Sequence, residues 1–222
     1  IDLANYPLNP VKVPGRIWIG NDPARGLWHV LDIFEIVRRE IPSATLHITY
    51  DFDRQFEQHR YRQNALAEMM WDCKRRIASM PGVVNRGGLE PTEVVREQRE
   101  AMIHCWPSDP PNLGSQIHGL SQAGAAAAGC ALVLSDVEAF PEVFGDAAVI
   151  LPTIGTYIPS AERRVDAGDY AEKVIELLGD PIVWQLASRK ARALAEQHTW
   201  EHVIARWDAM LEQVTSSVAV AA

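Results

Sequence analysis

The sequence lacks the motifs that define several common classes of enzyme. Its 222 residues contain no GxGxxG turn, Walker loop or GxSxG elbow, which argues against a NAD enzyme, a P-loop NTPase and an α/β-hydrolase. No apolar run approaches the ~20 residues that span a membrane, and the first residues lack the pattern of a signal peptide. The seven histidines show no metal-ligand spacing such as HExxH, so the sequence predicts no metal site.

Cysteine is scarce, and lysine is outnumbered by arginine. The three cysteines, Cys73, Cys105 and Cys130, are far apart and odd in number. They indicate buried thiols rather than a disulfide framework, so we expect a cytoplasmic protein, with peripheral attachment to a membrane left open. The net charge of −8 argues against global attraction to nucleic acid.

Strand-like and helix-like segments alternate along the chain. This alternation predicts an α/β fold with a doubly wound, parallel, Rossmann-like sheet and extra C-terminal helices. The expected strands are 16–20, 45–50, 83–84, 101–106, 131–135 and 147–151. The expected helices are 26–40, 64–79, 91–98, 116–128, 169–178, 181–196 and 200–218. Residues 51–62 are expected to form a loop, and Trp200 and Trp207 a buried stripe on the last helix.

Arg25 follows the first expected strand and stands just before a helix. Open α/β sheets bind ligands at the carboxyl ends of their strands. An arginine at a helix N-terminus is unfavourable for the helix dipole unless an anion lies between them. We therefore expect Arg25, helped by backbone N–H groups of the helix that starts at Gly26, to hold a phosphate; the alternative is a surface arginine paired with Asp22.

A second strand–loop–helix unit, from Cys105 to Gly129, has a similar layout. Hydroxyl and amide groups gather before its helix, and glycines there let a ligand approach the backbone closely. The residues concerned are Ser108, Asn112, Gly114, Ser115, Gln116, His118 and Gly119. The alternative is a proline-rich turn with a capping serine and a helix of small residues that packs on the sheet.

Two further loops remain open to either interpretation. Gly87 and Gly88 expose backbone groups that could read the edge of a flat base, or they form a simple turn. The carboxylates Asp136, Glu138 and Glu142 are candidates for acid–base work, although a solvated loop with a helix cap is the commoner explanation.

The order of these features resembles the C-terminal, donor-binding domain of group-1 (family 4 type) retaining glycosyltransferases with the GT-B fold. The resemblance extends from about Arg16 to Val214. Its motifs are Asn21–Leu27, Ile41–Ile48, Gly88-Leu89, Trp106–Ser108, Ala127–Val133, Phe140–Glu142 and the helix start at Trp200. The fold implied is one half of a GT-B enzyme.

The resemblance implies roles for residues of this chain. The basic residue that holds the donor diphosphate falls on Arg25, while an earlier basic position falls on Asn21. The glycine turn at Gly88 and Leu89 meets the nucleobase. Two glutamates of the family, eight positions apart, fall on Gln116 and Gly124. Gln116 still offers an amide to sugar hydroxyls, but Gly124 offers no side chain.

The sequence thus predicts a nucleotide-sugar-binding domain of a glycosyltransferase that acts without a metal. Arg25 and Gln116 are the expected catalytic residues. The expected donor-binding residues are Asn21, Gly26, Gly88, Leu89, Ser108, Asn112, Ser115, His118, Gly119 and Gly124. The donor is expected to be a UDP- or GDP-sugar, which is a substrate rather than a permanently bound cofactor.

Three segments are expected. Residues 1–15 form a linker from a preceding acceptor domain, 16–199 the donor domain and 200–218 a C-terminal helix. The acceptor, whether glycan, lipid or protein, is not indicated. The alternatives are a non-catalytic glycosyltransferase-like scaffold without the usual glutamate pair, another GT-B enzyme such as a sugar-nucleotide epimerase, and a doubly wound domain that binds no nucleotide.

Overall fold

The computed structural model describes residues 1–59, 65–108, 119–137, 139–153 and 165–220. These residues form a parallel sheet of six strands in the order β3-β2-β1-β4-β5-β6. The strands are β1 (Arg16–Ile19), β2 (Thr45–Ile48), β3 (Val83–Asn85), β4 (Ile103–Trp106), β5 (Ala131–Ser135) and β6 (Ala148–Leu151). All six were expected from the sequence, and the doubly wound fold is confirmed.

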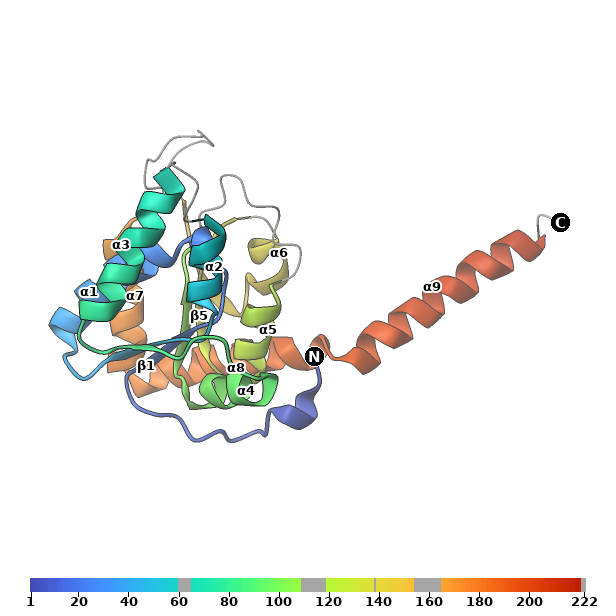
Figure 1. Ribbon diagram of the computed structural model, residues 1–222. Coiled ribbons are helices and arrows are strands. Elements are labelled where there is room, and N and C mark those ends of the chain that lie inside the picture. The colour runs from blue at the N-terminus through green and yellow to red at the C-terminus, as the bar shows by residue number, and fades with distance from the viewer. Residues whose placement is uncertain (60–64, 109–118, 138, 154–164, 221–222) are drawn as a thin grey trace.

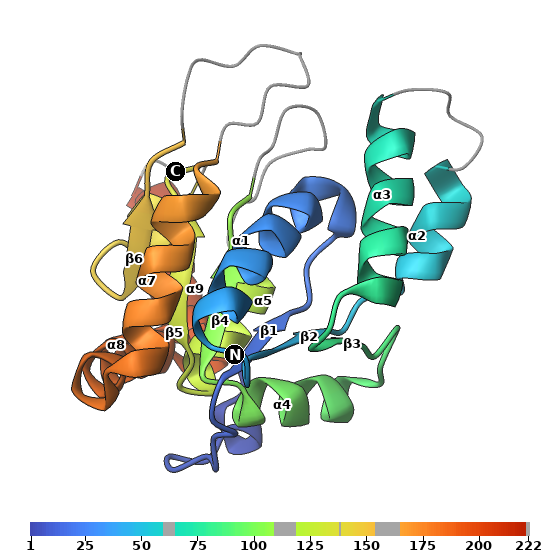
Figure 2. The same cartoon turned by 90° about the vertical axis from the view of Figure 1, so that its left-hand side faces the viewer.

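Helices cover both faces of the sheet (Figures 1 and 2). On one face lie α1 (Leu27–Glu40), α3 (Ala65–Ser79) and α7 (Ala167–Gly179). On the other lie α4 (Pro91–Glu100), α5 (Leu120–Ala127) and α8 (Pro181–Gln197). The remaining elements are η1 (Leu3–Asn5), η2 (Pro23–Arg25), α2 (Phe52–His59), α6 (Phe140–Phe144) and α9 (Trp200–Val220).

The core lies between the sheet and these two helix layers. Strand β4 is buried along its whole length, as is typical of a central strand covered on both faces. The alanines of α5 are buried almost completely, which brings this helix close to the sheet and to α8. His47 and His104 are also buried in their strands. Cys105 and Cys130 are buried as their apolar contexts predicted, and Cys73 is buried as well.

One segment that we expected to be a loop is a helix instead. In α2, Phe52 is buried against the core, and the Asp51 carboxylate accepts the backbone N–H of Arg54 at 3.0 Å. Lys74 of α3 also reaches Asp53 at 2.9 Å. A capping aspartate and a buried phenylalanine therefore stabilise a short helix whose sequence is mostly polar.

The predicted helix over 116–128 begins later, at Leu120. Gly119 has a φ of +75°, which is outside the helical region, so the helix cannot continue through it.

The last helix also departs from expectation. Figure 1 shows α9 extending away from the body after Thr199. Trp200 is 60% exposed and Trp207 56% exposed, so the stripe that we expected to be buried faces solvent. The helix itself was predicted correctly, but the large apolar side chains of its stripe are exposed rather than packed on the body.

Candidate functional site

The order in which the chain adds strands to the sheet reverses between β1 and β4. From β1 the chain moves outward to β2 and β3, and then returns to place β4 on the other side of β1. At such a switch point the loops diverge to opposite faces, which leaves a crevice at the carboxyl ends of the two strands. The loops after β1 and β4 carry the first two sites that the sequence predicted.

Arg25 lies at the end of the short helix η2, after β1. It is buried, with 9% of the residue exposed. Asp22 begins η2 and accepts the backbone N–H of Ala24 at 3.0 Å. Gly26, with a φ of 135°, turns the chain sharply from η2 into α1. This turn places Arg25 two residues before the first residue of α1.

The N-terminus of α5 reaches the same edge of the sheet. Ser121 in its first turn donates a hydrogen bond of 3.0 Å to the carbonyl oxygen of Gly20, directly after β1. Both α1 and α5 start at a glycine that supplies no capping side chain, and neither has an acidic residue in its first turn. By contrast, Asp166 and Asp180 cap α7 and α8. The N–H groups of α1 and α5 therefore suit an anionic ligand.

Two buried polar groups lie beside these helix starts. The Oδ1 atom of Asn21 follows β1, and the hydroxyl of Ser108 follows β4. Neither atom has a hydrogen-bond partner among the described residues. The backbone of Ser108 is held in place, because the Ser135 hydroxyl donates to its carbonyl oxygen at 2.9 Å. Unpaired polar atoms at this depth are uncommon and mark a place where a ligand can supply the partner.

Gly88 and Leu89 lie at the outer edge of the sheet, after β3. A Cβ atom on Gly88 would be 3.2 Å from the Cβ of Asp51, so a glycine allows the loops after β2 and β3 to approach closely. Burial and the carboxylate of Asp22 raise the pKa of the nearby Tyr50 hydroxyl, which therefore remains a hydrogen-bond donor at neutral pH. Leu89 is half-buried.

Four predicted residues, Asn112, Ser115, Gln116 and His118, lie outside the described residues, as do Gly114 and Glu138. Their roles stay predictions. Asp136 lies within the described chain, where its carboxylate accepts hydrogen bonds from the backbone and hydroxyl of Thr153 at 2.8 and 2.9 Å. These contacts favour the loop-stabilising interpretation of Asp136 over acid–base chemistry.

Gly124 lies in the middle of α5 and faces α4 rather than open space. A Cβ atom there would be 2.7 Å from Nε2 of Gln98 and 3.1 Å from the hydroxyl oxygen of Tyr6. Tyr6 in turn donates to Oε1 of Gln98 at 2.8 Å, and burial raises the pKa of Tyr6 to about 12. The space that a side chain at position 124 would need is thus filled by Gln98 and Tyr6.

The sequence analysis missed one polar residue of α5. Gln122 is completely buried, and neither atom of its amide has a partner within the described part of the chain. The signal was present, because a long polar side chain stands directly before the alanine-rich stretch that packs on the sheet.

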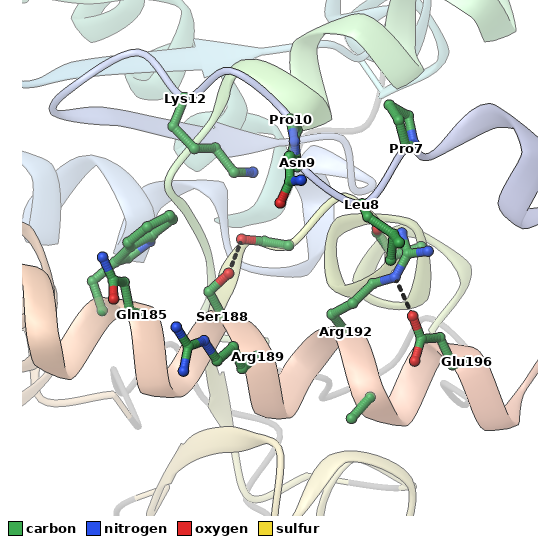
Figure 3. A pocket seen from close by; sticks show the side chains of 14 residues that line it. Pro7, Leu8, Asn9, Pro10, Lys12, Gln185, Ser188, Arg189, Arg192 and Glu196 are labelled. Atoms are coloured by element: carbon green, nitrogen blue, oxygen red, sulfur yellow. Dashed lines mark hydrogen bonds and ion pairs between the residues drawn. The ribbon is translucent and has the colours of Figure 1, made fainter.

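A cavity of about 540 Å³ lies at the opposite, amino edge of the sheet (Figure 3). Two of the cationic side chains that line it are engaged at the end of α5. Lys12 donates to the carbonyl oxygen of Ala128 at 2.7 Å, and Arg192 to that of Ala127 at 2.6 Å. Burial lowers the pKa of Lys12. These contacts satisfy the last carbonyls of the helix, so they have a structural explanation.

Two general findings bear on cofactors and membranes. Among the described residues, no group of three or more histidine, cysteine, aspartate or glutamate side chains is placed to hold a metal ion. Within the same residues, no helix has both the length and the apolar character that crossing a bilayer requires.

Comparison with known proteins gives no match by sequence, whether to a protein-family model or to a curated protein. Solved structures do match. Sucrose-phosphate synthase from Thermosynechococcus elongatus aligns with a TM-score of 0.66 at 14% identity, over 98% of this chain and 51% of that one. The chain has the fold of one GT-B glycosyltransferase domain.

Two further GT-B neighbours show the same relationship. TarM from S. aureus, solved with fondaparinux, alpha-GlcNAc-glycerol and UDP, aligns with a TM-score of 0.63 at 15% identity, over 93% of this chain and 37% of that one. The C-terminal domain of the group 1 glycosyltransferase LpcC from Francisella tularensis aligns with a TM-score of 0.61 at 14% identity, over 89% of this chain and 97% of that one. The chain therefore spans about one GT-B domain, and about a third to a half of the longer neighbours.

Proposed function

We propose that this chain binds a nucleoside-diphosphate sugar at the β1–β4 switch point, as the donor domain of a glycosyltransferase. The observation that carries the proposal is the meeting of two glycine-started helices, α1 and α5, at one edge of the sheet, with the buried Arg25 beside them. A diphosphate is the ligand whose charge and oxygen acceptors match this set of N–H groups and one guanidinium.

The catalytic contribution of such a site is to stabilise a leaving group. When the bond between the sugar and the diphosphate breaks, negative charge grows on the diphosphate. Fixed donors that point at this charge lower the barrier without reorganising. In this proposal, Arg25 and the N–H groups of α1 and α5 act as these donors.

Support for the ligand class comes from the neighbours. The crystal structure of TarM contains UDP, and the fold that TarM shares with this chain extends over 93% of this chain. We propose UDP- or GDP-sugars as donors. We also propose that the acceptor binds to a preceding domain, since this chain corresponds in length to one GT-B domain.

One observation favours a second candidate, a glycosyltransferase-like binding module without catalysis. The position of one family glutamate is held by Gly124, and Gln98 and Tyr6 fill the space beside it. The carboxylate that the family resemblance implies at this position is therefore absent. A module of this kind would bind a nucleotide and transfer no sugar even with an acceptor domain present.

A thermal-shift panel of UDP, GDP, ADP, CMP and their sugar conjugates tests the proposal. A ligand at 100 times its dissociation constant adds ~2.7 kcal/mol to the free energy of unfolding, which is readily measured. Arg25→Ala removes charge-assisted hydrogen bonds of about 1.5–3 kcal/mol, so affinity should fall roughly 10- to 150-fold. If the alanine variant does not fold, Arg25→Lys replaces it in this test, because lysine keeps the charge but not the guanidinium.

The matched control is Arg189→Ala, which removes an exposed arginine beside the cavity at the amino edge. It should leave the nucleotide shift unchanged. If no nucleotide raises the melting temperature, or if Arg25→Ala and Arg189→Ala behave alike, the proposed site is wrong.

A further inference from the structure

Two glutamines are buried in the helices α4 and α5, and they differ in how their amides are satisfied. Gln98 is 3% exposed, and its amide oxygen accepts the hydroxyl of Tyr6 at 2.8 Å. Gln122 is 0% exposed, and both atoms of its amide are without a partner among the described residues. The same side chain is thus structural at one position and unexplained at the other.

The amide of Gln122 lies at the ligand edge of the sheet. Gln122 is the third residue of α5, and its Oε1 atom is 2.7 Å from the position that a Cβ on Gly119 would take. The ring of Phe140 borders the same position at 3.1 Å. The amide therefore folds back over the start of α5, where only a glycine leaves room for it, instead of packing against a neighbouring helix.

Burying an amide without partners is unfavourable. An apolar side chain of similar size would remove that cost in a helix whose other buried residues are mostly alanine. Asn21 and Ser108 present unpaired polar atoms at the same edge. Three neutral, buried and unpaired side chains from the ends of β1 and β4 and the start of α5 point to a ligand as the missing partner.

We propose that Gln122 determines specificity by binding hydroxyl groups of the sugar in the donor, an inference that rests on the proposed function. An amide has a donor and an acceptor, and two neighbouring hydroxyls can satisfy both. A diphosphate only accepts hydrogen bonds, so it would leave the amide oxygen unpaired. A sugar whose charged group faced this amide would leave one of the amide's atoms unpaired in the same way.

The order of the strands supports this assignment over the nucleobase. Gly88, where the base is expected, follows β3 at one margin of the sheet, and Arg25 follows β1 near its centre. Gln122 and Phe140 lie on the other side of β1, on the elements that follow β4 and β5. Base, diphosphate and sugar would then lie in sequence along the edge from β3 towards β5.

The test compares Gln122→Met with Gln98→Met, two changes with the same chemistry. The probes are the nucleoside diphosphate that gives the largest shift in the panel and its glucose conjugate. Gln122→Met should keep its affinity for the nucleoside diphosphate within about twofold and lose about tenfold for the conjugate. Its urea midpoint should equal or exceed that of the parent, because an unpaired amide has been removed. Gln122→Leu is the second variant if methionine overfills the space.

Gln98→Met should show the reverse: a lower urea midpoint and an unchanged preference for the conjugate over the nucleoside diphosphate. If Gln122→Met lowers stability and leaves that preference intact, Gln122 is structural and this inference alone fails. Equal weakening of both probes would also overturn it, since the residue would then act on the diphosphate or base. If the parent binds no nucleotide at all, the proposed function fails and takes this inference with it.

Discussion

The substitution Gly124→Ala tests whether packing requires a glycine at position 124, where the family that this chain resembles has a glutamate. The new Cβ would lie 2.7 Å from Nε2 of Gln98, so the Gln98 amide would have to rotate away. Rotation breaks the 2.8 Å hydrogen bond with Tyr6, in a place that water does not reach. Unpairing these buried groups costs about 2–5 kcal/mol in all, whereas alanine in a helix interior contributes about 1 kcal/mol over glycine. We therefore expect Gly124→Ala to lower the free energy of unfolding by about 1–4 kcal/mol.

Urea unfolding followed by tryptophan fluorescence measures this difference, because Trp18 and Trp106 are buried in the core. The control is Gly179→Ala at the end of α7, where a Cβ meets nothing within 4 Å. Adding Gln98→Ala to Gly124→Ala should recover part of the loss, since the clash disappears together with the larger side chain. A Gly124→Ala protein more stable than the parent by about 1 kcal/mol would show helix propensity acting alone, and the reasoning would be refuted.

Two further predictions concern pH and the last helix. Burial lowers the pKa of His104 from 6.5 to about 4, so between these values the unfolded chain binds a proton that the folded chain does not. The free energy of unfolding should therefore fall by about 3 kcal/mol as the pH drops from 7 to 4. In His104→Gln, which cannot titrate, the urea midpoint should depend less on pH over this range. An unchanged pH dependence in this variant would contradict the prediction. Ending the chain after Thr199 removes α9, whose large apolar side chains are exposed, so calorimetry should find the melting temperature within about 2 °C of the parent, and a drop beyond about 5 °C would show that α9 stabilises the body.

The strands and most helices could be predicted because local signals and packing agree. Apolar runs that end at glycine or proline gave the strands, and helical spacing gave α1, α7 and α8 almost to the residue. The signals failed where a single contact decides the structure. Phe52 and the cap at Asp51 form α2 without a long periodic pattern, and the left-handed Gly119 stops α5 from starting earlier.

The candidate site was predictable in part for a related reason. The position of Arg25 after a strand and before a helix is local information, and it placed the residue at the carboxyl edge of the sheet, where the structure has it. The unpaired amide of Gln122 and the filled space beside Gly124 depend on residues far away in the sequence, such as Phe140 and Tyr6. For the last helix the apolar spacing predicted the helix correctly. Spacing alone does not tell whether another part of the protein packs against Trp207.

The carbonyls at the end of α5 receive their hydrogen bonds from both ends of the chain: Lys12 before the first strand, and Ser188 and Arg192 in α8. The C-terminal end of α5 is thus held by hydrogen bonds from residues some 60 to 116 positions away in sequence. Its last turn cannot fray independently, because each of those donors would have to detach first. We therefore expect the last turn of α5 to open together with residues 6–12 and α8, as parts of one cooperative unit that hydrogen exchange would detect.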